Sequence, residues 1–342
     1  GEDVGWKGVV TVRVDKREDG REVEARVRKE IQGLEALINK SNHPKSNRDV
    51  RRRDPVTPQD TEEESKNSER RYESWINLIS KAIQYMNLGN MSKVVLARCV
   101  PYTPPGAINV SSTLSSLSAS FPECCTFFIK LPRRPAFLGA TPERLIRLRG
   151  TRMETEALAG TIGRGRNADE DMENGAKLLA SLKDRKEHQL VVDEIRGLLA
   201  PISRNLNIPP VPSVRKLKNV FHLETNIEAE LRDDAELFDL VEKLHPTPAL
   251  GGTPRDVALK WMAKNEGWER GWYAAPIGWS DREGNGEFVV AIRSALISEQ
   301  DSKVWLFSGC GIVPGSNPES EWEETNVKLR AMLEALRADS EA

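Results

Sequence analysis

The chain has 342 residues, which is long enough for one large domain or two smaller ones. Its 50 basic and 52 acidic residues nearly cancel and leave a formal net charge of −2, so no overall field directs it to nucleic acid or to an anionic membrane. No apolar run approaches the roughly 18 residues that a membrane-spanning helix needs. Selection of a charged ligand must therefore come from local charge in a pocket.

The cysteines and the N-terminal residues indicate a reducing compartment. The four cysteines are Cys99, Cys124, Cys125 and Cys310, without a CxxC spacing. None of the four histidines forms a metal-spaced cluster with them, so a zinc site is not expected. The opening residues GEDVGWKG carry no signal-peptide pattern. We expect a cytoplasmic protein with inert thiols.

The first ninety residues contain two predicted helices separated by a polar stretch. Residues 8–14 alternate as in a strand, and 22–39 have the apolar spacing of an amphipathic helix. Residues 41–69 are polar and predict a solvated loop. A second helix is expected from Tyr72 until Gly89 ends it. Its predicted buried face consists of Trp75, Ile76, Ile79, Ala82, Ile83 and Met86.

The remaining chain alternates short strands with a few helices. Strands are expected at 94–100, 125–131, 136–140, 144–148, 152–158, 271–277, 287–298 and 303–309, with a strand pair around 213–230. Helices are expected at 111–121, 168–200, 234–243, 254–265 and 318–337. Because turns rather than helices join many strands, we predict an α+β fold of large antiparallel sheets flanked by helices.

The last predicted helix carries a carboxylate-rich face. Glu321, Glu324 and Lys328 are spaced to share that face, and the Ser-Asn-Pro run at 316–318 suits a helix start. Carboxylates in the first turns also complement the helix dipole, which is the ordinary explanation. Just before this helix, Gly309 and Gly311 allow either a tight turn or close approach by a ligand.

A second carboxylate cluster lies within KDRKEHQLVVDEI at 183–195. Asp184, Glu187 and His188 fall within one helical turn there. Alone this is an ordinary charged helix. Together with Glu321 and Glu324 it offers carboxylates from two helices, a donor set that suits Mg²⁺.

Three charged residues stand in apolar surroundings. A lysine at a strand start, as Lys93 is, is usually a solvated edge residue, but a buried one can serve as a base. Glu143 lies at a turn between strands, from which a side chain can project into a cleft. Arg293 lies in an apolar strand and must pair with a carboxylate of the protein or of a ligand.

The stretch at 160–165 is rich in glycine and predicts a loop. It contains Gly160, Thr161, Gly163 and Gly165. It matches neither GxxxxGK[ST] nor GxGxxG after a strand, so nucleotide binding is rejected for it.

Taken together, these segments resemble the chorismate-utilising enzyme family, and within it the isochorismate synthases. The matching segments, spread over about residues 90–335, are SKVVLAR, FLGATPERLIRL, EALAGTIGRG, KDRKEH, LHPTPALGG, RGWYAAPIGW, GEFVVAIRSALI and GCGIVPGSNPESEWEE. The resemblance implies an anthranilate synthase component I-like fold, with 90–342 as the chorismate-binding catalytic domain. Residues 1–89 would be an N-terminal region of the same domain, and the chain looks shortened at that end.

The resemblance also implies catalytic and metal-binding roles. Lys93 would be the base that activates water for attack at C2 of chorismate, and Glu143 the acid that protonates the departing C4 hydroxyl. Because an acid must hold its proton, we expect burial or nearby charge to raise the pKa of Glu143. Glu187 and Glu324 would hold Mg²⁺, supported by Glu321.

Further residues would bind the substrate. Tyr273 and Arg293 would hold the enolpyruvyl carboxylate. Ala249 and Leu250 would lie where the family discriminates water from ammonia. The other expected substrate-binding residues are Gly160, Thr161, His222, Thr247, Gly309, Gly311 and Lys328.

The implied activity is a Mg²⁺-dependent isomerisation of chorismate to isochorismate, most simply for menaquinone biosynthesis and as a monomer without an obligatory protein partner. Alternatives are a siderophore-pathway isochorismate synthase, a salicylate synthase, or the ammonia-using anthranilate and aminodeoxychorismate synthases. A relative that binds chorismate without turnover is a further alternative.

Overall fold

Two antiparallel β-sheets form the framework of the protein in the computed structural model, which describes residues 62–104, 106–131, 134–232, 235–300 and 302–337. The first sheet has six strands in the order β2, β3, β12, β13, β1, β9. Their bounds are β1 Lys93–Tyr102, β2 Cys125–Lys130, β3 Ala136–Thr141, β9 Gly252–Thr253, β12 Ser294–Ser298 and β13 Lys303–Ile312.

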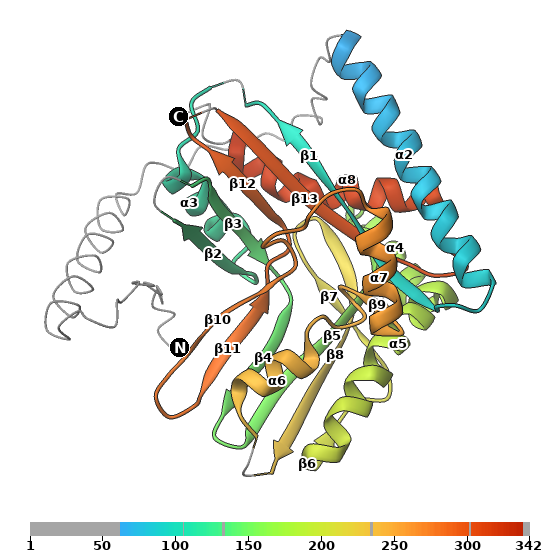
Figure 1. Ribbon diagram of the computed structural model, residues 1–342, viewed down its shortest axis with the longest axis vertical. Helices are drawn as coiled ribbons and strands as arrows, with labels where there is room; N and C mark the ends of the chain where they lie inside the picture. The colour runs from blue at the N-terminus through green and yellow to red at the C-terminus, as the bar shows by residue number, and fades with distance from the viewer. Residues whose placement is uncertain (1–61, 105, 132–133, 233–234, 301, 338–342) are drawn as a thin grey trace, which may run out of the picture. The chain divides into compact units, whose positions relative to one another are not determined.

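The second sheet has seven strands in the order β10, β11, β4, β5, β8, β6, and β7 pairs with β8 beside them. Their bounds are β4 Arg144–Arg149, β5 Arg152–Gly163, β6 Ser203–Asn207, β7 Ser213–Lys216, β8 Val220–Leu231, β10 Pro276–Ser280 and β11 Gly286–Val290. In Figure 1 the strands β1, β12 and β13 lie above β4, β5 and β8. The predicted α+β class with antiparallel sheets is confirmed.

Helices cover the sheets. They are α2 Glu62–Asn87, α3 Val110–Ser120, α4 Ala168–Ala180, α5 Leu182–Leu199, α6 Leu237–Leu244, α7 Arg255–Asn265 and α8 Pro318–Arg337, with a short 3₁₀ turn at Ala200–Ile202. Helices α3 and α8 pack on β3, β12 and β13, while α2 and α7 pack on β1 and β13. Of the described helices, none is long and apolar enough to cross a membrane.

The largest core lies between the two sheets. Phe137 and Phe307 from the first sheet meet Leu145 and Met153 from the second, and Ile195 of α5 joins them. All five side chains are buried, and burying each one stabilises the fold by roughly 1.5–3 kcal/mol. This core fixes the sheets against each other and so fixes the residues carried at their junction.

Two neighbouring chain segments connect the first sheet to the second. Residues 142–143 connect β3 to β4, and 291–293 connect β11 to β12. The crossings are tied together, because Ala140 N–H donates to the Arg293 carbonyl at 3.2 Å and Val290 N–H donates to the Glu143 carbonyl at 3.1 Å. The prediction of one strand over 287–298 is therefore wrong: the chain changes sheets within it, and Arg293 has a φ of 52° instead of a strand conformation.

The N-terminal predictions have mixed outcomes. The strand at 8–14 and the helix at 22–39 lie outside the described residues. The polar loop predicted over 41–69 is wrong for 62–69, because α2 begins at Glu62. The first turns of α2 have no apolar stripe from which a helix could be predicted, but their Glu, Lys and Arg residues are good helix formers. On the predicted apolar face, Trp75, Ile79, Ala82 and Met86 are buried.

Local chemistry explains two further corrections. The single helix predicted over 168–200 is wrong because Ser181 is extended and its hydroxyl caps a new helix by accepting the Asp184 N–H at 3.2 Å. The glycine-rich loop predicted at 160–165 is wrong for 160–163, because β5 continues to Gly163, and the loop begins only at residue 164. The register shift between Ala159 and Thr161, with Gly160 at a φ of 80°, is a β-bulge within that strand.

Other boundary predictions differ less. The strand expected at 271–277 begins only at Pro276, because residues 271–274 form a turn. Strand β6 was not predicted, since its sequence SRNLN is polar and its side chains are largely exposed. The last helix is confirmed as predicted, with the Asn317 side chain accepting the Ser320 N–H at 2.8 Å at its start.

Candidate active site

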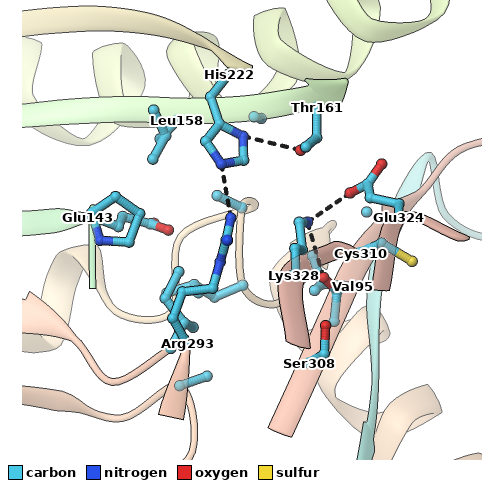
Figure 2. Close-up of a pocket in the computed structure, with 18 of the residues that line it drawn as sticks. Val95, Glu143, Leu158, Thr161, His222, Arg293, Ser308, Cys310, Glu324 and Lys328 are labelled. Atoms are coloured by element: carbon cyan, nitrogen blue, oxygen red, sulfur yellow. Dashed lines mark hydrogen bonds and ion pairs between the residues drawn. The ribbon is translucent and has the colours of Figure 1, made fainter. Parts of the chain in front are cut away.

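A cleft lies where the sheets, α5 and α8 meet, and it holds about 670 Å³ of space that is partly open to solvent. The predicted site residues that line it are Glu143, Gly160, Thr161, Glu187, His222, Ala249, Leu250, Tyr273, Arg293, Gly309, Gly311, Glu324 and Lys328. Figure 2 shows Glu143, Arg293, His222 and Lys328 around this space.

Glu143 projects into the cleft from the crossing between β3 and β4 (Figure 2). Its side chain is buried, and no described residue donates a hydrogen bond to its carboxyl group. Burial, followed by the charge of Glu156, raises the pKa of Glu143 to about 8, against the opposing effect of Lys93 and other cations. The predicted rise is confirmed. This group holds a proton at neutral pH and can act as an acid.

Arg293 comes from the neighbouring crossing and is also buried. Its Nη2 donates to Nε2 of His222 at 2.8 Å, as Figure 2 shows. Within the described residues no carboxylate forms an ion pair with Arg293, although we expected such a partner from the protein or a ligand. The guanidinium is therefore a buried cation facing the cleft without a neutralising anion, which is the electrostatic requirement of an anion-binding site.

His222 of β8 is neutral and has a defined tautomer. Burial and the nearby Arg293 lower the pKa of His222 well below its usual range. Because arginine can only donate, Nε2 of His222 must accept, and the proton resides on Nδ1. Nδ1 lies 3.2 Å from the Gly160 carbonyl and 3.0 Å from Oγ1 of Thr161. The bulge at Gly160 thus orients His222, which in turn orients Arg293.

Lys93 lies behind the cleft wall, not among its lining residues. A solvated edge position is excluded, because β1 lies between β13 and β9 and the Lys93 side chain has no exposed surface. Its Nζ is 3.0 Å from Oε1 of Glu187, an ion pair without hydrogen-bond alignment. Although burial acts to raise the pKa of Glu187, Lys93 and Lys183 outweigh it and hold that pKa below its usual value.

Gly311 makes room for this ion pair. A Cβ at Gly311 would overlap Oε1 of Glu187 and lie 2.9 Å from Cε of Lys93. Gly309, two residues earlier on β13, similarly leaves space for the hydroxyl of Tyr273, which would lie 2.9 Å from an added Cβ. The glycines expected to accommodate a ligand thus first accommodate protein side chains.

Lysines neutralise two carboxylates of α8. Lys183 pairs with Glu321 at 2.7 Å, and Lys328 pairs with Glu324 at 2.6 Å while also donating to the Gly309 carbonyl at 3.0 Å. Burial and the charge of Glu324 still raise the pKa of Glu321 to about 7. One oxygen of Glu321, Oε2, is buried without a hydrogen-bond partner. Negative charge at this end of the cleft is therefore incompletely compensated.

These carboxylates fit a hard cation in their chemistry. Glu187, Glu321 and Glu324 offer only oxygen donors, the type that Mg²⁺ takes, and the unpartnered Oε2 of Glu321 is a ready acceptor. No group of three acidic, histidine or cysteine side chains is drawn together as a closed metal site in the part of the chain that the structure describes. Lysine ammonium groups instead hold these carboxylates, so a cation must compete with them.

Three predicted residues do not line the cleft. Lys93 is connected to the cleft through its ion pair with Glu187, whereas Lys183, the partner of Glu321, does not line the cleft either. Thr247 is buried in the loop after α6, and its hydroxyl has no partner among the described residues. In the same loop, Ala249 and Leu250 do reach the wall.

Sequence reasoning missed the ion pair of Glu266 and Arg270. Arg270 lines the cleft and donates to Oε2 of Glu266 at 2.8 Å, to the Val95 carbonyl at 2.7 Å and to the Leu250 carbonyl at 3.2 Å. Glu266 also accepts the Ala97 N–H at 2.9 Å. The pair ties β1 to the loop carrying Leu250. Both residues come after the last residue of α7, so helical i, i+4 spacing did not signal the pair in the sequence.

Comparison with known proteins shows which family the chain belongs to. The sequence profile of the chorismate binding enzyme family matches residues 10–337. This chain belongs to that family. The two sheets described above are therefore the framework of a chorismate binding enzyme, and the predicted family and fold are confirmed.

Individual relatives carry more specific names. The chain is 47% identical over 264 residues to the salicylate biosynthesis isochorismate synthase of Pseudomonas aeruginosa, and 43% identical over 264 residues to isochorismate synthase MenF of Bacillus subtilis. Each alignment covers 77% of this chain but only 55% of the relative, so the chain spans about half the length of these relatives.

Solved structures agree. The structure of MenF, the menaquinone-specific isochorismate synthase of Escherichia coli, has a TM-score of 0.71 and 34% identity, covering 78% of this chain and 61% of that one. Anthranilate synthase component I of Streptococcus pneumoniae has a TM-score of 0.67 at 20% identity, covering 93% and 67%, and supports the fold alone.

Proposed function

We propose that this protein is an isochorismate synthase, which converts chorismate to isochorismate by adding water at C2 and releasing the C4 hydroxyl. The observation that carries the proposal is Arg293, a buried cation without a carboxylate partner among the described residues, facing the same cleft as the protonated Glu143. A dianionic substrate that must lose a hydroxyl group needs both. Two relatives that are named isochorismate synthases support the same activity.

In the proposed mechanism Arg293 and Tyr273 bind the enolpyruvyl carboxylate. His222 holds the guanidinium of Arg293 in place through its Nε2. Because the guanidinium and its partner are already oriented, little reorganisation is needed when the anion binds. Ala249 and Leu250 form the wall beside the reacting ring.

The two proton transfers are assigned to two residues, Lys93 as the base and Glu143 as the acid. Lys93 would take a proton from water as the new bond to C2 forms, which requires its uncharged amine and hence an opened pair with Glu187. Glu143 would give its proton to the C4 oxygen as that bond breaks, so that water leaves. The raised pKa of Glu143 supports this role, because the proton is present at neutral pH.

Mg²⁺ is the proposed cofactor, held by Glu187 and Glu324 with Glu321 beside them. When bound it would grip the ring carboxylate of chorismate and neutralise the surrounding carboxylates. The incompletely compensated charge around Glu321 supports this assignment. Before a cation enters, Lys183 pairs with Glu321 and Lys328 pairs with Glu324, so these ammonium groups balance part of the negative charge.

The metabolic role is proposed more broadly. Isochorismate for menaquinone biosynthesis remains our proposal, supported by the likeness to the menaquinone-specific enzyme of Escherichia coli. The relative from Pseudomonas aeruginosa is named for salicylate biosynthesis, which equally requires isochorismate. We further propose a cytoplasmic monomer that acts without an obligatory protein partner.

The test is incubation of the purified protein with chorismate in H₂¹⁸O, with and without Mg²⁺, followed by liquid chromatography and mass spectrometry. We expect isochorismate carrying one ¹⁸O atom, and no product when the metal is chelated. Salicylate together with pyruvate would instead identify a salicylate synthase. Glu143→Gln should fold but lose turnover; full activity in that variant would remove Glu143 from its assigned role.

A further inference from the structure

Glu156 is a buried carboxylate that the proposed mechanism does not use. It lies on β5, does not line the cleft and is 5% exposed. Its Oε1 accepts the Arg144 N–H at 2.7 Å, and Nη1 of Arg215 on β7 lies 3.0 Å from each of its oxygens. A buried carboxylate is unfavourable unless paired in this way, so its presence calls for a reason.

The first effect of Glu156 is on the backbone that carries Glu143. The Glu143 N–H donates to Oγ1 of Thr141 at 3.2 Å, and its carbonyl accepts from Val290 at 3.1 Å. The next N–H, that of Arg144, is held by Glu156. Three hydrogen bonds thus fix the crossing between the sheets and the direction in which the Glu143 side chain leaves it.

The second effect is electrostatic. Glu156 has a cation and an N–H donor, whereas no described residue donates to the carboxyl of Glu143. Hydrogen bonds and cations favour an ionised carboxylate, so of these two groups Glu156 carries the charge and Glu143 the proton. Burial raises the pKa of Glu156 too, but Arg215 and the Arg144 N–H act against it.

Other charges facing the pair are accounted for. The cations acting on Glu143 are Lys93 on β1, Lys328 on α8 and Arg293, and all of them favour its ionised form. Around Glu156, besides Arg215, the carboxylate of Glu224 on β8 disfavours ionisation and the side chain of Arg144 favours it. Among the charged groups that act on Glu143, Glu156 is thus the one that helps to keep its proton.

We propose that Glu156 is a positioning residue for Glu143, holding the backbone at its C-terminal side and presenting a fixed negative charge to its carboxyl group. This inference rests on the proposed function, in which Glu143 is the acid. The Arg215 side chain, anchored on the strand that pairs with β8, keeps that charge in place.

The test compares Glu156→Gln with wild type through the pH dependence of kcat/KM. Glutamine keeps an oxygen that can accept the Arg144 N–H but removes the charge. Glu143 should then lose its proton at lower pH, so the alkaline limb of the profile, the pH range over which kcat/KM falls, moves to lower pH. A shift of one pH unit corresponds to about a tenfold loss of kcat/KM at pH values above the limb. Glu156→Asp, which keeps the charge, should leave the limb near its wild-type position while lowering kcat.

Glu154→Gln is the matched control. Glu154 lies two residues earlier on the same strand, outside the cleft, and pairs with Arg147 at 3.5 Å. Its substitution should leave the limb unchanged. An unchanged limb in Glu156→Gln, or an equal shift in both variants, would overturn the inference.

A second measurement does not depend on turnover. Carbon-13 NMR of protein labelled at glutamate carboxyl carbons follows the titration of Glu143, identified by the signal missing in Glu143→Gln. We expect this signal in wild type to titrate well above the ordinary range of glutamate. Titration near the ordinary value would overturn the inference even in an active enzyme. Wild type could make no isochorismate and still show a raised pKa of Glu143 that falls in Glu156→Gln. In that case only the proposed function fails.

Discussion

Gly311→Ala gives a direct test of how tightly the cleft floor is built. The added methyl group would overlap Oε1 of Glu187 and lie 2.9 Å from Cε of Lys93. Gly311 pairs with Val95 in the interior of the first sheet, so its backbone cannot retreat without breaking the ladder. Either the two side chains separate or the strands move apart.

The expected loss of stability follows from these contacts. Overfilling a packed site costs about 1–3 kcal/mol. Removing one partner of a buried ion pair costs about 3–5 kcal/mol, which is an upper bound here because both partners remain. We therefore expect the free energy of unfolding to fall by about 2–4 kcal/mol. At about 2–4 °C per kcal/mol, the melting temperature should drop by roughly 4–16 °C.

Differential scanning calorimetry and urea titration measure this effect, and Gly315→Ala is the control. A Cβ at Gly315 meets nothing within 4 Å, and the residue lies four positions later in the chain. Gly311→Ala should also lose turnover, since it displaces Lys93. Equal melting temperatures and equal activities in the two variants would refute the described packing.

Three further predictions use other parts of the structure. Because the pKa of Glu143 rises from 4.5 to about 8 on folding, the folded state holds a proton that the unfolded state releases, and stability is lost as pH rises from about 4.5 to 8. Glu143→Gln should remove this loss, so its melting temperature should gain on wild type between pH 5 and 8; a constant difference would contradict the linkage. Lys183→Met removes the cation that pairs with Glu321 at 2.7 Å, so calorimetric titration with Mg²⁺ should give a several-fold lower Kd, and weaker binding would speak against competition. Gly197→Ala, within α5 and with nothing within 4 Å of an added Cβ, should raise the unfolding free energy by about 0.5–1 kcal/mol in urea titration, and a loss would indicate an unseen contact.

The sequence was most informative where a pattern is local. The apolar spacing of Trp75, Ile79 and Met86 predicted the buried face of α2, and the Asn-Pro start at 317–318 predicted α8. The break at Ser181 was also readable in principle, because serine followed three residues later by aspartate is a capping signal.

What the sequence could not provide depends on distant strands. The burial of Lys93 follows from β9, a two-residue strand some 160 positions later, which removes β1 from the sheet edge. Arg293 looked like part of a strand because the apolar pattern continues through it, while the change of sheet leaves no local mark. Glu156 was invisible for the same reason: its partners Arg144 and Arg215 come from two other strands.

The backbone of Arg293 sets stability and function against each other. A φ of 52° is a left-handed conformation that glycine or asparagine adopts more readily than arginine, at a difference of order 1 kcal/mol. A library randomised at this position and screened for heat resistance alone should therefore enrich glycine and asparagine. The same library selected for product formation should return arginine. Divergence between these two selections would mark position 293 as a place where evolution has accepted a less stable chain in order to keep a cation in the cleft.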